Sequence, residues 1–132
     1  MGHPATLYGL ELAPCDVLVL GVKLDGRPLG GLTGHVDWRT GGRLSELVRL
    51  GTVPKEGPLM LPAPSVVAAS RILLWAQADV SVDKLSICLK NLRATRPGVC
   101  PADLGLDPVA VRAALGPHAV LFSSTGESAE GG

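Results

Sequence analysis

The sequence has few aromatic residues and no excess of charge of either sign. Its 132 residues include two tryptophans, one tyrosine and one phenylalanine, and twelve lysines and arginines balance twelve aspartates and glutamates. Nucleic-acid binding needs a basic surface for the phosphates, and single strands also need aromatic side chains on which bases stack. We therefore expect an aliphatic core, and we do not expect nucleic acid to be the main partner.

Cysteines and long apolar runs are also scarce. The three cysteines are an odd number without a Cys-x-x-Cys pair, which argues against a disulfide framework. The longest uncharged apolar run, residues 17–22, is far too short to cross a bilayer. We predict a cytoplasmic protein without a membrane segment. We expect Cys88 to pack on an apolar helix face and Cys100, in a loop, to be the most exposed thiol.

What the sequence does contain is a regular alternation of buried strands and helices. The strands are expected at 6–12, at an edge of the sheet, and at 16–22, 58–61, 71–76 and 118–123, and the helices at 44–50, 82–92 and 107–116. Ser81 and Asp107 are the expected N-caps of the last two helices. This order predicts a single α/β domain over residues 1–123, with a mixed or mostly parallel sheet flanked by helices on both faces. The polar, acidic residues 124–132 are expected to be a disordered tail.

The stretch GGLTGHVDWRTGGRLSELVRLG, residues 30–51, is rich in glycine. It contains neither a Walker phosphate loop nor a G-x-G-x-x-G fingerprint. His35 and Asp37 would share a face on a strand, but no further ligand is close in sequence, so we expect no metal site. We interpret the stretch as a loop that leads into the helix at 44–50, with glycines that provide backbone freedom.

Asp16 and three glycines are the candidate ligand-binding residues. Asp16 stands at the start of a buried strand, where it either caps nearby main-chain amides or contacts a ligand. In the second case Gly30, Gly31 and Gly34 would line the same pocket, because the loop after residue 22 follows the carboxyl end of that strand.

Trp38 is interpreted as either a core residue or an interface anchor. As an interface anchor it would act together with Arg39 and Arg43, although such a short basic stripe is usually ordinary surface. No Gly-x-Ser-x-Gly motif is present, and no cysteine has a neighbouring histidine. We therefore assign no catalytic residue.

Five segments follow one another between Asp16 and Gln77: DVLVLGV, DGRPLGG, GGRLSELVRLG, KEGPLMLP and ASRILLWA. In this order they resemble the amino-terminal domain of the leucyl aminopeptidase family. In the family, the strand that matches ASRILLWA usually ends in Gly-x-Gly, whereas this chain has Trp75-Ala76-Gln77 at that position. The family's metal ligands and its N-T-D-A-E-G-R segment belong to a carboxyl-terminal domain that nothing in this sequence resembles. The resemblance therefore transfers no catalytic residue.

The resemblance implies a stand-alone, non-catalytic module that acts through contacts with a protein partner or with itself. It also implies an alternative, because the family's amino-terminal domain looks like the macro domain, which binds ADP-ribose in some members. In that alternative the protein binds a nucleotide or an ADP-ribose-type ligand. Asp16 and the glycines of residues 30–34 would then hold it, with helix-start amides on the phosphate. We rank the interaction module first, expect no cofactor and keep an enzyme with an unrecognised site as a third hypothesis.

Overall fold

The computed structural model describes residues 15–25, 29–63 and 69–122. Within them the chain forms a five-stranded sheet of order β2-β3-β1-β4-β5. The strands are β1 (Val17–Val22), β2 (Pro58–Pro62), β3 (Arg71–Ala76), β4 (Gly98–Val99) and β5 (Val120–Leu121). β1 pairs in parallel with β3 and β4, β4 pairs in parallel with β5, and β2 is antiparallel to β3. The predicted mixed, mostly parallel sheet is confirmed.

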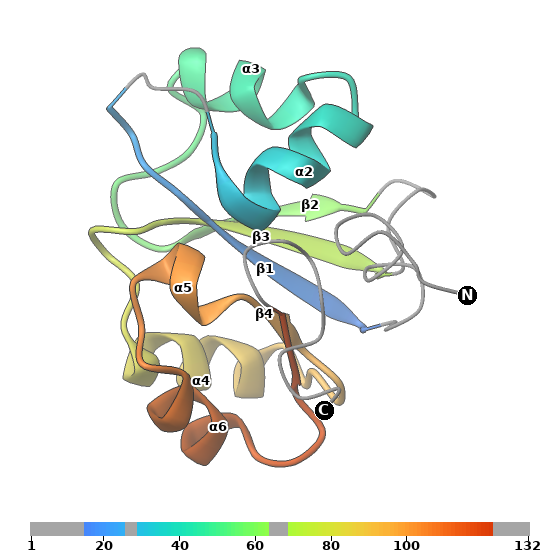
Figure 1. Ribbon diagram of the computed structural model, residues 1–132, viewed down its shortest axis with the longest axis vertical. Coiled ribbons are helices and arrows are strands. Elements are labelled where there is room, and N and C mark those ends of the chain that lie inside the picture. The colour runs from blue at the N-terminus through green and yellow to red at the C-terminus, as the bar shows by residue number, and fades with distance from the viewer. Residues whose placement is uncertain (1–14, 26–28, 64–68, 123–132) are drawn as a thin grey trace.

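Helices cover both faces of this sheet, as Figure 1 shows. They are α2 (Gly31–Arg39), α3 (Arg43–Arg49), α4 (Val82–Asn91), α5 (Pro101–Leu104) and α6 (Pro108–Leu115). Leu18 and Leu20 of β1 pack in the core layer of α2 and α3, whereas Val17 and Val19 pack in the layer of α4, α5 and α6. Because successive side chains of a strand point to opposite faces, a strand covered on both faces must be apolar throughout. This explains the unbroken run VLVLGV.

Local signals set the ends of two helices. The Ser81 hydroxyl accepts a hydrogen bond from the Lys84 amide at the start of α4. The Asp107 carboxylate accepts one from the Val109 amide at the start of α6, where Pro108 is the first helical residue. Both predicted N-caps are confirmed. The predicted edge strand at 6–12 and the predicted tail, residues 124–132, lie outside the described residues.

Three elements differ from the sequence-based expectation. Residues 31–39 form α2, although the glycines predicted a loop there. β4 was not predicted, because a strand of two residues is too short to show a hydrophobic periodicity in the sequence. Cys100, expected in a loop with an exposed thiol, begins the short helix α5 and is only 1% exposed. The prediction of an exposed thiol was therefore wrong, and burial raises the pKa of this thiol to about 11.

In the ranges that the structure describes, no helix combines the length and the apolar character needed to cross a membrane. The cytoplasmic location stays a prediction.

Candidate functional site

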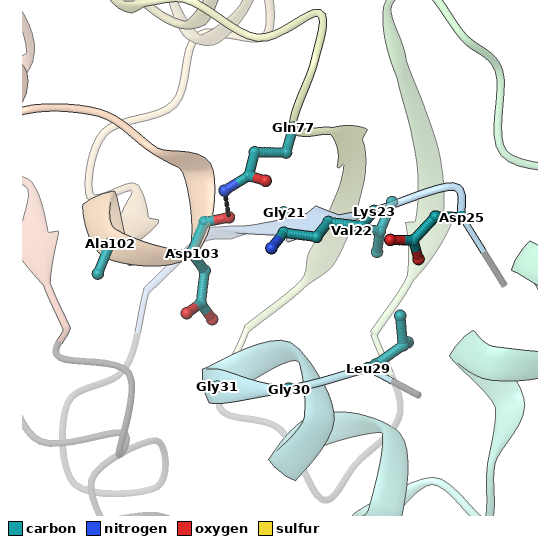
Figure 2. A pocket seen from close by; sticks show the side chains of 10 residues that line it. All are labelled: Gly21, Val22, Lys23, Asp25, Leu29, Gly30, Gly31, Gln77, Ala102 and Asp103. Atoms are coloured by element: carbon teal, nitrogen blue, oxygen red, sulfur yellow. Dashed lines mark hydrogen bonds between the residues drawn. The ribbon is translucent and has the colours of Figure 1, made fainter. Parts of the chain in front are cut away.

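A pocket of about 320 Å³ opens at the carboxyl ends of β1 and β3. Four parts of the chain line it, as Figure 2 shows. They are the end of β1 with the residues after it (Gly21, Val22, Lys23 and Asp25), the start of α2 with the residue before its N-cap (Leu29, Gly30 and Gly31), the turn after β3 (Gln77), and the side of α5 (Ala102 and Asp103). Ligands of open α/β sheets usually bind at this end of the strands.

Asp103 reaches from α5 to the first turn of α2. Its Oδ2 accepts hydrogen bonds from the main-chain amides of Leu32, at 2.7 Å, and Thr33, at 3.2 Å. The N-cap residue of α2 is Gly30, which has no side chain to cap the helix. The carboxylate of a different helix therefore satisfies two of the amides that a helix start leaves without partners. Burial raises the pKa of this carboxyl group, and the hydrogen bonds from the two amides and the Cys100 thiol, together with the nearby His35, counteract that rise only in part.

Two glycines allow this close approach. A Cβ on Gly31 would overlap the Asp103 carboxylate, and the φ of Gly31 is +60°, where other residues are strained. A Cβ on Gly21 would overlap the main-chain carbonyl oxygen of Asp103. The hydroxyl of Thr33, which is 1% exposed, donates to the Gly21 carbonyl at 2.7 Å. These contacts tie α2, β1 and α5 together behind the pocket.

The pocket presents both charges and a side-chain amide. Lys23 is exposed, and in Figure 2 its side chain extends along the cavity toward α5. The Gln77 side chain donates from Nε2 to the main-chain oxygen of Asp103 at 3.3 Å, which leaves its Oε1 as a further acceptor near the cavity. The charged groups that line the pocket are the Lys23 ammonium and the carboxylates of Asp25 and Asp103. The main chain of Gly30 and Gly31 forms a further part of the wall.

A second cavity of about 480 Å³ adjoins the first and shares Val22, Lys23, Asp25 and Gln77 with it. The residues that only this cavity contacts are mostly apolar, with one further lysine: Leu24, Lys55, Ala76 and Ala78. The two cavities thus offer a charged compartment and a more apolar one on either side of the ends of β1 and β3.

The structure brings together some of the predicted ligand-binding residues but not all. Gly30 and Gly31 line the pocket. Gly34 is not among the lining residues. It lies inside α2, where a Cβ would overlap the carbonyl oxygen of Leu29. Its lack of a side chain serves packing between the helix and the segment before it.

Asp16 lies at the opposite, amino end of β1. Its Oδ1 accepts from the amides of Val17 at 2.9 Å and Arg96 at 3.1 Å, and its Oδ2 accepts from the Thr95 amide at 2.6 Å and hydroxyl at 3.2 Å. Partial burial raises its pKa, but these hydrogen bonds outweigh that effect and the pKa lies below its usual value. Asp16 thus caps main-chain amides and does not line the pocket with the glycines.

The predicted interface residues lie on α2 and α3, away from the pocket lining. Trp38 is 76% exposed, so it is not a core residue. Arg43 forms an exposed ion pair with Glu46 at 3.4 Å, and Arg39 also interacts with a neighbouring group. Its exposure leaves the indole available for contact.

His35 and Asp37 lie on α2, where positions two apart point to different sides. The Asp37 carboxylate accepts hydrogen bonds from the amide and the hydroxyl of Ser45 and so fastens α2 to α3. Among the residues that can be described, no cluster of three or more potential metal ligands is found.

Sequence reasoning missed Lys23, Gln77 and Asp103. The first two directly follow predicted buried strands, and their position at the carboxyl ends of parallel strands could have identified them. Asp103 gives no such signal, because α5 has only four residues and its partner α2 was not predicted.

No protein-family model matches the sequence, and no curated protein matches it. Solved structures do match. The macrodomain of Thermus aquaticus DarG aligns with a TM-score of 0.61 and 14% identity, over 86% of this chain and 93% of that chain. The macrodomain of Mycobacterium tuberculosis DarG aligns with a TM-score of 0.59 and 16% identity, over 93% of this chain and 94% of that chain. Similarity at this level of identity concerns the fold, and the chain has the fold of these macrodomains.

Proposed function

We propose that this protein is a binding module for a nucleotide or ADP-ribose-type ligand, which it holds in the pocket at the carboxyl ends of β1 and β3. The observation that carries the proposal is the position of this pocket in a macrodomain-type fold. It lies where open α/β sheets bind their ligands, and exposed glycine main chain forms part of its wall. This was the alternative in the sequence analysis, and the fold now favours it over the interaction module.

Lys23 is the proposed partner of a ligand phosphate. An ammonium group is a strong donor to phosphate oxygens, and Lys23 borders both adjoining cavities. The amides of Leu32 and Thr33 do not serve this purpose in the present arrangement, because Asp103 already occupies them. The more apolar neighbouring cavity, with Leu24 and Ala76, has the character that suits a nucleobase.

Calorimetric titration with ADP-ribose and with AMP tests the proposal. We expect the wild-type protein to bind at least one of them, and Lys23→Gln to weaken that binding about tenfold or more, as for a lost charge-assisted hydrogen bond. Lys90→Gln, which removes the same charge from the exposed side of α4, is the matched control and should bind as wild type does. If neither compound binds the wild-type protein, the proposal is wrong.

A protein-interaction module remains a second candidate, favoured by two exposed apolar side chains. Trp38 at the end of α2 is 76% exposed and Leu50 after α3 is 68% exposed. The resemblance to the amino-terminal domain of leucyl aminopeptidases bears on this candidate, since it would make a peptidase of that family the first partner to test. Co-sedimentation of the wild-type protein and Trp38→Ala with such a peptidase tests it. Complex formation that depends on Trp38 would support it, and no complex would contradict it.

A further inference from the structure

The pocket contains a carboxylate where the start of a helix would otherwise attract an anion. α2 has nine residues, and helix starts of this kind carry partial positive charge and free amides that suit phosphate. Here the Asp103 carboxylate already accepts from the amides of Leu32 and Thr33. We propose that Asp103 excludes phosphate from the amino end of α2 and selects ligands that present hydroxyl or amino donors there. This inference rests on the proposed function, because it concerns the specificity of the same pocket.

Contacts of the Asp103 main chain fix the position of its carboxylate. The Asp103 carbonyl oxygen accepts from Gln77 Nε2 and lies against Gly21, and the neighbouring Leu104 is 1% exposed. The side chain fills the space that a Cβ on Gly31 would take. A phosphate that approached the same amides would have to displace this group and would then lie within a few ångströms of its charge, which is strongly unfavourable in a partly buried site.

The same geometry indicates which part of a ligand fits beside Asp103. A carboxylate accepts hydrogen bonds, so it suits a sugar hydroxyl or an exocyclic amine and repels an anion. Lys23 provides the opposite preference from the end of β1. A ligand with both features, such as a nucleoside monophosphate or ADP-ribose, would therefore place its hydroxyls at α2 and its phosphate at Lys23. Free pyrophosphate carries several negative charges and has neither a sugar hydroxyl nor an amine, so it should bind poorly beside Asp103.

Calorimetry with pyrophosphate on two charge-removing variants tests this inference. We expect Asp103→Asn to bind pyrophosphate at least about tenfold more tightly than wild type, because the repelling charge has gone. Asp25→Asn is the matched control, since Asp25 lines the same pocket away from the start of α2 and should give a smaller gain. Equal gains in the two variants, or no gain in Asp103→Asn, would overturn the inference.

Amide NMR spectra of the wild-type protein provide a second measurement if Asp103→Asn does not fold. With pyrophosphate at the highest concentration the protein tolerates, the Leu32 and Thr33 amide signals should not shift. Saturable shifts of these two signals would show that phosphate reaches the helix start and would overturn the inference. The proposed function fails separately, namely if the wild-type protein binds neither ADP-ribose nor AMP whatever pyrophosphate does.

Discussion

Two aspartates at opposite ends of the sheet both accept hydrogen bonds from main-chain amides, but their pKa values are shifted in opposite directions. Asp16, at the amino end of β1, accepts from amides at positions 95 and 96, and Asp103, at the carboxyl end, accepts from the amides of Leu32 and Thr33. Each carboxylate joins segments far apart in sequence. Yet the pKa of Asp16 lies below its usual value and the pKa of Asp103 lies above it.

The difference lies in the balance between burial, which raises the pKa of each carboxyl group, and the hydrogen bonds that lower it. Both oxygens of Asp16 accept main-chain hydrogen bonds, and Thr95 adds its hydroxyl. Both main-chain bonds to Asp103 go to Oδ2, while burial acts against its charge and the carboxylate borders a cavity. A carboxylate whose hydrogen bonds outweigh its burial stabilises the fold in its charged form. A carboxylate for which burial outweighs the hydrogen bonds, and which borders a cavity, has the kind of perturbed pKa that groups at functional sites often show.

Glycine substitutions should give the largest contrast between the two ends. In Gly21→Ala the new methyl group would overlap the main chain of Asp103, whereas in Gly98→Ala it would meet the Cys15 and Phe122 side chains, which can adjust. We expect Gly21→Ala to lower the free energy of unfolding by about 3 kcal/mol and Gly98→Ala by about 1 kcal/mol. Chemical denaturation measures both values. Gly30→Ala, where a Cβ meets nothing, is the control, and equal losses at Gly21 and Gly98 would break the contrast.

Replacing each aspartate by asparagine should separate the two carboxylates at neutral pH. An asparagine at position 16 has one oxygen and one NH2 group, so its NH2 would face either the amides of Val17 and Arg96 or the amide of Thr95, which are themselves donors. We expect the free energy of unfolding to fall by about 1–2 kcal/mol. An asparagine at position 103 can accept both bonds through its single oxygen, so we expect a change within about 0.5 kcal/mol. Urea denaturation of the two variants checks this. A larger loss for Asp103→Asn would reverse the assignment of roles.

The pH dependence of stability should differ in sign between the two groups. Because the folded-state pKa of Asp16 is lowered, its contribution is present above the unfolded value of about 3.9 and is lost as pH falls below it. The gap between wild type and Asp16→Asn should therefore close toward pH 3. Because the folded-state pKa of Asp103 is raised, wild type should gain stability relative to Asp103→Asn as the pH falls toward 4. Parallel denaturation curves across pH 3–7 for all three proteins would contradict both statements.

The smallest effect is expected far from both carboxylates, at Trp38. Its side chain is 76% exposed, so Trp38→Ala should change the free energy of unfolding by less than about 0.5 kcal/mol. Thermal unfolding measures this directly. A loss of several kcal/mol would mean that the indole is buried in solution, by self-association or otherwise, and would strengthen the interaction module as the main function.

The elements that were predicted correctly are those whose signals are local. β1 and β3 are continuous apolar runs that a sheet covered on both faces requires. α4 and α6 have helical periodicity and begin at Ser81 and Asp107, whose side chains cap them. Such features need no knowledge of distant residues, so the fold class followed from them.

The site could be predicted only in part, because it depends on contacts between distant residues. Gly31 and Gly34 disfavour a helix, but burial of Leu32 and Val36 and the Asp103 carboxylate, 71 residues away from Leu32, stabilise α2 nonetheless. Nothing near Asp16 in sequence distinguishes a cap from a ligand contact, since apart from the amide of Val17 its hydrogen-bond partners lie 79 and 80 residues away. Gly30 and Gly31, which line the pocket, were candidates because glycines can be read directly from the sequence; their contact with a ligand stays a prediction.

We propose ligand binding at the carboxyl end of the sheet and not at the amino end. The most direct test is a titration of the isotope-labelled protein with ADP-ribose, followed by amide NMR. We predict saturable shifts at Gly21, Lys23, Gly31 and Gln77, with the Thr95 amide unchanged. Shifts centred on Thr95, or no shift at any concentration, would contradict the account.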